Sequence, residues 1–335
     1  MHFALNRLSL DGVHPFVEAA VRAEDLGWTM GLTPCNPLKM QDPYIMLSQA
    51  AQATSTLHLG TLLDTPQLRH PSVLAGSICT VAEFAPGRIH CGLGVGDTAV
   101  RFNGLRPAGV GEFEAACRLA RAFIRGEAVA VDAPVPARLN HATPVPLWVA
   151  AQGPKNLAMA GRVADGVWIR VGRHPANLRM AWEAVCEGAA SVGRDVSEMS
   201  VGLILHTTIC DDPVTAKTIA KAIAAGYYEY SKHLFEYPGF SWDGEDVHVL
   251  RREAYPDFLH HRDPQHAGSL VDFLSDEVAD SFALYGDWEQ VAEQLSPLLE
   301  MDLPISYVLP HPVLPLGSDI DYLGDAAAHL LPHFA

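Results

Sequence analysis

The stretch "VPLWVAAQGPKNLAMAGRVADGVWI", residues 145–169, decides the fold. Two apolar β-type runs, 145–151 and 164–169, flank a segment rich in alanine and glycine that reads as a helix. A strand, a helix and a second strand in this order predict parallel pairing with a right-handed crossover. If the chain is built from such units, the same alternation should recur along its length.

Short β-type runs do alternate with helical periods along the whole chain. Eight candidate strands result, at 1–7, 28–33, 57–63, 87–94, 145–151, 164–169, 200–209 and 305–310. Eight β–α units close most economically into a (β/α)8 TIM barrel, an α/β fold that can hold 335 residues as one unit. We therefore expect a single domain over 1–335, with a helical insertion at about 227–286, before the last strand, that caps the barrel mouth.

Composition favours a globular protein and disfavours several kinds of partner. Hydrophobic residues make up 49% of the chain and charged residues 19%, which permits a large core. The formal net charge of -16 would repel nucleic acid and acidic membrane surfaces. No basic segment precedes a long apolar core at the start, and no apolar run approaches about 18 residues. We expect a cytoplasmic location without a membrane span, and an anionic ligand would need local positive features.

Cysteines and histidines show no metal-binding pattern. The six cysteines are scattered without C-x-x-C spacing, which favours buried, reduced thiols over disulfides or zinc ligation. His260, His261 and His266 have neither the i, i+4 spacing nor the glutamate of a zinc helix. We therefore expect no metal site.

The turn from Gln152 to Asn156 suits an anion. Its backbone N–H groups lie at the start of a predicted helix, where the helix dipole and Lys155 both favour a phosphate. In a barrel this loop also follows a strand, so it lies at the C-terminal face, where barrel enzymes carry their chemistry. A tight turn with a solvated lysine explains the same residues without any ligand.

A second motif, "GLGVGDTA" at 92–99, contains the pattern G-x-G-x-x-A. It follows the fourth candidate strand rather than the first, and no strand-end acid lies about 20 residues later, so we reject a Rossmann dinucleotide site. Glycines at a strand end also let a flat ring lie close against the backbone, which is the use we prefer. A glycine-rich turn that needs positive φ is the alternative.

A third motif is "LGTLLDTPQLRHP" at 59–71. Asp64 follows an apolar strand end, where a polar side chain costs least if it faces a cavity. Arg69, His70 and Pro71 could simply start and fix the next helix.

Together, "RHPSVLAGSICTVAEFAPGRIHCGLGVGDTAVRFNGLRPA" (69–108) and "GPKNLAMAGRVADGVWI" (153–169) resemble the luciferase-like monooxygenase superfamily. The most similar branch is the deazaflavin-dependent oxidoreductases typified by methylenetetrahydromethanopterin reductase. The resemblance implies a TIM barrel that binds FMN or coenzyme F-420 at its C-terminal face, a small-molecule substrate and a homodimer. The anion at the Gln152 turn would then be the phosphate of a flavin-type coenzyme.

The resemblance also implies which residues form the coenzyme site. It places a bulge, often a non-prolyl cis peptide, at Leu62-Leu63, behind the flavin-type ring. The other coenzyme-binding positions that it implies are Asn6, Asp64, Gly94, Val95, Gly96, Ala151, Gln152, Gly153, Pro154, Lys155, Gly172 and Arg173. Of these, the residues from Ala151 onward would hold the phosphate.

Two positions depart from the reductase branch. Its first strand ends with a glutamate where this chain has Asn6, and its second usually carries an Asp-His pair where this chain reads Pro34-Cys35-Asn36. The remaining catalytic candidates are Asp97, Cys35 and His206. Asp97 could donate a proton or orient substrate, while a buried, inert Cys35 and a structural His206 are the alternative interpretations.

The hypothesis is an oxidoreductase that transfers a hydride between coenzyme F-420 and a small organic substrate, while the protein orients and desolvates the coenzyme. F-420 is preferred because the wording "GPK...AG..ADGV" is common in that branch. An FMN-dependent monooxygenase and a catalytically idle flavin-binding member of the fold remain alternatives.

Overall fold

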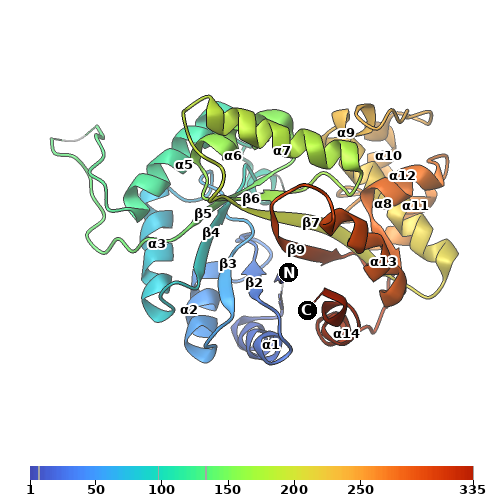
Figure 1. Ribbon diagram of the computed structural model, residues 1–335, viewed down its shortest axis with the longest axis horizontal. Coiled ribbons are helices and arrows are strands. Elements are labelled where there is room, and N and C mark those ends of the chain that lie inside the picture. Colours follow the sequence, from blue (N-terminus) through green and yellow to red (C-terminus); the bar gives the residue numbers. More distant parts are fainter. Residues whose placement is uncertain (7, 97, 133, 335) are drawn as a thin grey trace.

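Eight parallel strands close into a barrel in the computed structural model, which describes residues 1–6, 8–96, 98–132 and 134–334 (Figure 1). Around the ring the strands are β1 (His2–Asn6), β2 (Met30–Thr33), β3 (His58–Thr61), β4 (Ile89–Leu93), β5 (Leu147–Ala151), β6 (Gly166–Ile169), β7 (Ser200–Ile209) and β9 (Ile305–Pro312). Pairing of β6 with β7 and of β9 with β1 closes the ring. The predicted TIM barrel is confirmed, and all eight predicted strands form.

One further strand escaped sequence analysis. β8 (Leu284–Gly286) pairs in parallel with the last residues of β7, outside the ring of eight. It has only three residues, which is too short for an alternating pattern to show.

Helices surround the barrel on its outside (Figure 1). They are α1 (Val13–Asp25), α2 (Pro43–Ala53), α3 (Pro71–Phe84), α4 (Thr98–Phe102), α5 (Val110–Ile124), α6 (Pro154–Val163), α7 (Pro175–Ala190), α8 (Pro213–Tyr230), α13 (Trp288–Leu299) and α14 (Tyr322–His329), followed by the 3-10 turn Leu331–Phe334. Several begin with proline after a capping side chain: Asp42 accepts from the first turn of α2 and Asp212 from that of α8. Within the described ranges no helix combines the length and apolarity needed to cross a membrane.

The inside of the barrel is filled by side chains. Trp148 and Trp168 lie there with ring centroids 5.0 Å apart, among other apolar residues of the strands. A Cβ on Gly166 would lie 2.4 Å from the Trp148 ring, and one on Gly202 would lie 2.3 Å from the Trp168 ring. Glycine at these two positions therefore makes room for the indoles, and the barrel is a packed core rather than a channel.

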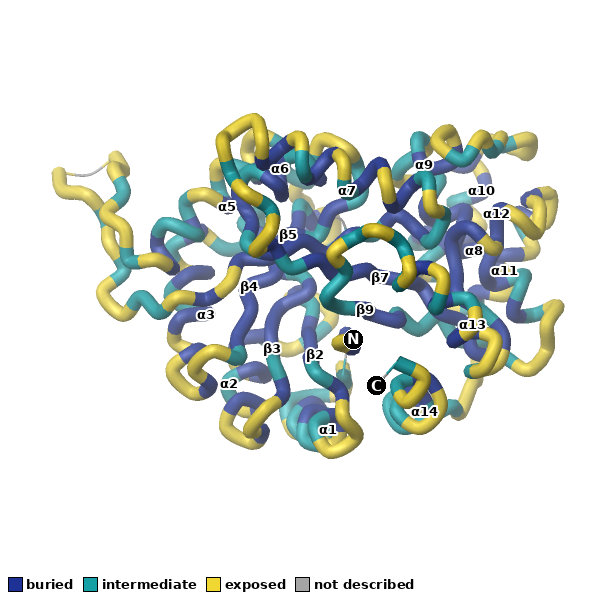
Figure 2. Tube along the Cα trace, in the orientation of Figure 1, coloured by how far each residue is buried: buried dark blue, intermediate teal, exposed yellow. Residues whose placement is uncertain are grey.

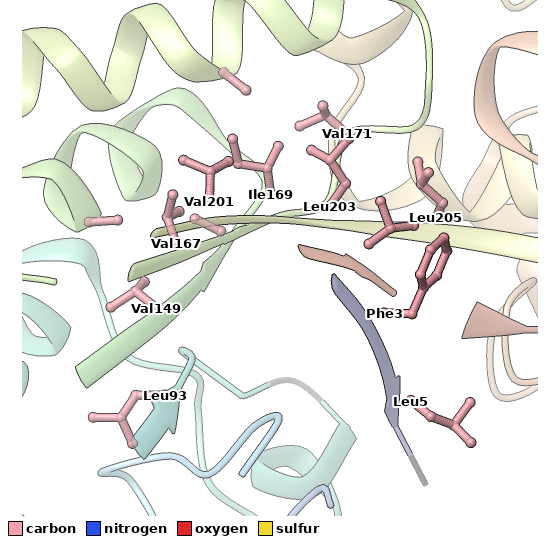
Figure 3. Packing of buried hydrophobic residues seen from close by; sticks show 14 of the residues in the cluster. Phe3, Leu5, Leu93, Val149, Val167, Ile169, Val171, Val201, Leu203 and Leu205 are labelled. Atoms are coloured by element: carbon pink, nitrogen blue, oxygen red, sulfur yellow. The ribbon is translucent and has the colours of Figure 1, made fainter. Parts of the chain in front are cut away.

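The alternate residues of the same strands face outward and pack under the helices. Figure 3 shows ten of these labelled side chains: Phe3, Leu5, Leu93, Val149, Val167, Ile169, Val171, Val201, Leu203 and Leu205. Figure 2 shows the same division along the chain, with the strands buried and the outer surfaces of the helices exposed. This two-sided burial fixes which residues point toward the barrel axis.

The segment after α8 folds as four short helices, α9 (His233–Glu236), α10 (Val247–Glu253), α11 (Pro264–Ser269) and α12 (Asp276–Phe282). These helices pack against α8. Asn177 of α7 donates from Nδ2 to the carbonyl oxygens of Leu234 (2.9 Å) and Val171 (3.3 Å). These bonds fix α9 beside the loop that follows β6, at the C-terminal face, while a capping role for 227–286 stays a prediction.

Candidate active site

Polar side chains replace apolar ones where the strands reach the C-terminal mouth. Side chains alternate between the two faces of a strand, and the strand interiors contribute apolar residues such as Trp168 and Leu309 to the barrel axis. On five strands, the residue two positions after an apolar interior side chain is polar. These five residues are Asn6, Gln152, Arg170, His206 and His311. By the same alternation they face the mouth.

The turn after β5 is an open helix N-terminus. Gly153 is the N-cap of α6 and gives no capping side chain, and Pro154 opens the helix. Lys155 is exposed and makes no ion pair with any residue that the structure describes. First-turn N–H groups and one cation therefore lie together, as the sequence predicted, in the geometry that binds phosphate groups.

Three side-chain atoms around this turn are buried yet lack a hydrogen-bond partner within the described chain: Gln152 Nε2, Asn156 Oδ1 and His233 Nε2. His233 comes from α9, and its Cε1 lies 4.0 Å from the position that a Cβ on Gly153 would take. Its ring is hydrogen-bonded to the backbone of Gln152, and burial lowers its pKa. Because buried polar groups are normally paired, this convergence indicates that a polar ligand completes the turn. We call these residues, with Gly153 and Lys155, the phosphate corner.

Arg170 connects the phosphate corner to the other side of the mouth. It donates from Nη1 to Gln152 Oε1 (2.9 Å), and its guanidinium carbon lies 5.2 Å from the ring centroid of Tyr227. The Tyr227 hydroxyl lies 3.1 Å from Nδ1 of His206, whose ring centroid is 5.3 Å from that of His311. His206, only 4% exposed, is thus held by a tyrosine and faces a second histidine at the mouth.

The predicted bulge lies at the end of β3. The Leu62-Leu63 peptide is cis, as the resemblance implied. Asn6 donates from Nδ2 to the Leu62 carbonyl oxygen (2.9 Å), and the Cys35 N–H donates to that of Leu63 (3.0 Å). A Cβ on Gly94 would lie 2.4 Å from Leu63 Cδ2, so a larger residue there would have to displace the Leu63 side chain. β1, β2, β3 and β4 therefore meet at this peptide.

Asp64 is fully buried, and the protein's own donors satisfy its carboxylate. It accepts from the Tyr44 hydroxyl and from the Thr65 N–H, both at 2.7 Å, and Arg69 Nε lies 3.6 Å away. Arg69 also pairs with Asp42, the N-cap of α2. Asp64 thus holds the strand ends together, and His70 caps α3, in line with the structural interpretation of this motif.

Cys35 lies beside this network. Burial, and then the Asp64 carboxylate, raise the pKa of its thiol to about 12. The side chain is therefore a neutral thiol over the physiological range, because the thiolate is disfavoured there.

Gly172 and Arg173 contact the C-terminal end of the neighbouring helix α12. Gly172 has φ +76°, and a Cβ on it would lie 2.7 Å from the Ser281 carbonyl oxygen. The Arg173 N–H bonds to that same carbonyl, and its Nε donates to Ala283 O (2.8 Å). Burial lowers the pKa of this guanidinium. These contacts anchor the loop after β6, and a role toward the phosphate stays a prediction.

The loop after β4 is described only in part. Gly96 has φ +65°, and the Val95 carbonyl accepts from Thr65 Oγ1 (3.2 Å). Asp97 lies outside the described residues. In the part of the chain that the structure describes, no group of three or more His, Cys, Asp or Glu side chains could hold a metal ion.

Sequence reasoning missed three residues at this site: Arg170, His311 and His233. Counting two residues on from the interior residues Trp168 and Leu309 would have found Arg170, just past the end of β6, and His311, within β9. His233 carries no such signal, because the long segment after α8 brings it to Gly153.

This fold and site define a class of protein. Residues 2–300 match the family model described as luciferase-like monooxygenase, and the chain belongs to that family. The prediction of family is confirmed.

Individual proteins similar to this chain are named as particular enzymes. Over 195 residues the chain is 32% identical to 5,10-methylenetetrahydromethanopterin reductase of Methanolobus tindarius, covering 55% of this chain and 59% of the relative. It is 31% identical to F-420-dependent glucose-6-phosphate dehydrogenase of Beutenbergia cavernae over 190 residues, covering 52% and 55%. These matches span under two thirds of the relatives' length. The solved structure of coenzyme F-420-dependent tetrahydromethanopterin reductase from Methanopyrus kandleri superposes with a TM-score of 0.77, at 21% identity, covering 100% of this chain and 99% of that one.

Proposed function

We propose that the protein is a coenzyme F-420-dependent oxidoreductase that transfers a hydride between the deazaflavin and a small organic substrate. The observation that carries the proposal is the phosphate corner, where Gln152 Nε2, a buried donor without a partner in the described chain, lies beside an open helix N-terminus. The names of several relatives state F-420 as coenzyme or describe a methylenetetrahydromethanopterin reductase, which favours F-420 over FMN.

The residues present fit such a coenzyme. Gln152 Nε2, the first-turn N–H groups of α6 and Lys155 would hold its phosphate. The cis peptide at Leu62-Leu63 would back its ring at the C-terminal mouth, and Gly94 leaves room for the Leu63 side chain behind that ring. When bound, the coenzyme supplies the hydride chemistry.

The chain's own residues would orient the coenzyme and manage the proton. The Asn6 amide replaces an acid of the reductase branch and is already bonded to Leu62 O. Cys35 is held as a neutral thiol. Proton transfer then falls to His206, which Tyr227 holds at the mouth, or to Asp97, as the resemblance implies.

Absorbance spectroscopy and native mass spectrometry test this proposal, followed by titration with F-420 and with FMN. We expect saturable binding of F-420 and turnover with a panel of small alcohols, ketones and aldehydes. A yellow, FMN-loaded protein that consumes oxygen would support the monooxygenase instead. Tight F-420 binding without turnover of any substrate would support the idle member of the fold. A homodimer, a cytoplasmic location and a single capped domain stay expectations of this proposal.

A further inference from the structure

Arg170 is a cation at the barrel mouth without an acidic partner among the described residues. We propose that it binds an oxyanion of the substrate, so that the substrate class is a small organic compound that carries a carboxylate or a phosphate. The inference rests on the proposed oxidoreductase function and narrows its substrate.

The Arg170 side chain is held in place, but only part of its hydrogen-bonding capacity is used. Its backbone N–H donates to Ala151 O (3.1 Å), its Nη1 donates to Gln152 Oε1 (2.9 Å), and the guanidinium lies over the Tyr227 ring. A guanidinium has five N–H donors in a rigid fork. Within the described residues the others have no acceptor, and no carboxylate pairs with this group.

Two other partly buried arginines in the described chain form an ion pair or more hydrogen bonds than Arg170 does. Arg121 pairs with the carboxylate of Asp165, and Arg194 donates to two backbone carbonyl oxygens. Acids are abundant, because the chain has 39 acidic and 23 basic residues. Removing a charge from water without a counter-charge is unfavourable. A position that keeps such a charge at the mouth of a barrel is suited to an incoming anion.

Aromatic rings lie beside the Arg170 guanidinium. Tyr227 lies under the guanidinium, and its hydroxyl bonds to His206. His311, beside His206, follows the interior residue Leu309 on β9. The Tyr227 hydroxyl is already bonded to His206, so an anion on the side of the mouth formed by β6, β7 and β9 would bind to the remaining N–H groups of Arg170.

Gln152, a residue of the phosphate corner, lies between the Arg170 guanidinium and the rest of that corner. Because arginine only donates, the Gln152 oxygen must face Arg170, and its Nε2 then points away as the unpartnered donor of the corner in the described chain. The corner therefore has its own donors for the coenzyme phosphate, and the remaining N–H groups of Arg170 can bind a second anion.

Two titrations test the inference on the full chain. The first measures F-420 affinity for the wild type, Arg170→Gln, Arg170→Lys and the control Arg179→Gln, which removes one exposed charge from α7 on the outside of the barrel. The second measures binding of inorganic phosphate and of succinate by calorimetry, on both unliganded and F-420-loaded protein. Bound F-420 fills the phosphate corner, so phosphate or succinate that still binds to the loaded protein must bind at another site, which we assign to Arg170.

We expect the loaded wild type to bind an anion, Arg170→Gln to bind it about tenfold or more weakly, Arg170→Lys to retain part of the affinity, and Arg179→Gln to match the wild type. F-420 affinity should change by less than about threefold in Arg170→Gln, because the introduced amide can still donate to Gln152 Oε1 and the first-turn N–H groups of α6 and Lys155 are unchanged. Equal anion binding by wild type and Arg170→Gln overturns the inference. So does a tenfold loss of F-420 affinity in Arg170→Gln, which would assign Arg170 to the coenzyme.

The proposed oxidoreductase function and the role of Arg170 would fail on different measurements. A wild type that binds no F-420 refutes the oxidoreductase, while the anion titration of unliganded wild type against Arg170→Gln still decides whether Arg170 holds an anion.

Discussion

Replacing Gln152 by glutamate tests the phosphate corner with almost no change of shape. The carboxylate that Gln152→Glu introduces keeps an oxygen for Arg170, which now gains a charged partner in place of the amide oxygen at 2.9 Å. The other oxygen takes the place of Nε2, the buried atom that has no partner in the described chain. The change therefore removes one donor and adds one negative charge at the position assigned to the phosphate.

The expected rise in the coenzyme Kd follows from the loss of one donor, Gln152 Nε2. A hydrogen bond to a charged acceptor contributes about 1.5–3 kcal/mol, and each factor of ten in Kd corresponds to about 1.4 kcal/mol. Loss of the donor alone predicts a Kd for the coenzyme about 10–150 times higher, and repulsion between the carboxylate and the phosphate acts in the same direction.

The assay is a fluorescence titration with F-420, repeated with FMN because both coenzymes carry a phosphate. Gln52→Glu is the matched control, since it adds the same charge on α2, where Gln52 is exposed and bonds only to Ser48 O within the described chain. Circular dichroism confirms that each variant is folded. A folded Gln152→Glu protein that binds the coenzyme within twofold of the wild type would refute the assignment of Gln152 to the corner.

Three more predictions concern other residues. Lys155→Ala should raise the coenzyme Kd by about fivefold or less, because Lys155 is exposed and exposed ion pairs contribute about 1 kcal/mol at most; the effect should shrink in high salt, and a salt-independent loss would contradict it. Cys35 should resist iodoacetamide at pH 8 in the folded protein, since its thiol pKa is raised to about 12; peptide mass spectrometry measures this, and rapid native labelling would be inconsistent with a buried neutral thiol. Burial lowers the pKa of His90 to about 3, so the unfolded chain binds the extra proton first and stability should fall from pH 6.5 toward pH 3. Between pH 6.5 and 5 this one group predicts a loss of about 1.6 kcal/mol. Denaturant unfolding should show the full loss for wild type and for exposed His14→Gln, and a loss smaller by about that amount for His90→Gln, in which the other buried histidines still contribute.

The barrel could be predicted because its signal is local and repeated. Each strand reads as a short β-type run followed by a helix, and a parallel sheet with helices on the outside is what such units form. β8 could not be predicted, because three residues carry no period.

The site was predictable where it depends on the strand-to-helix turn, and less so where it depends on packing. Gly153 and Lys155 lie at an open helix N-terminus, as the sequence indicated. Asp64 follows a strand end as expected, but Tyr44, 20 residues earlier, bonds to its carboxylate, and no local pattern reveals such a partner. The Leu62-Leu63 cis peptide was expected from the family resemblance alone.

A crystal structure with F-420 bound tests the central claim most directly. We expect the coenzyme phosphate at the N-terminus of α6, within hydrogen-bond distance of Gln152 Nε2, and the deazaflavin ring against Leu62-Leu63 at the C-terminal mouth. A coenzyme found with its phosphate at another loop, or an empty mouth in crystals grown at saturating F-420, would contradict it.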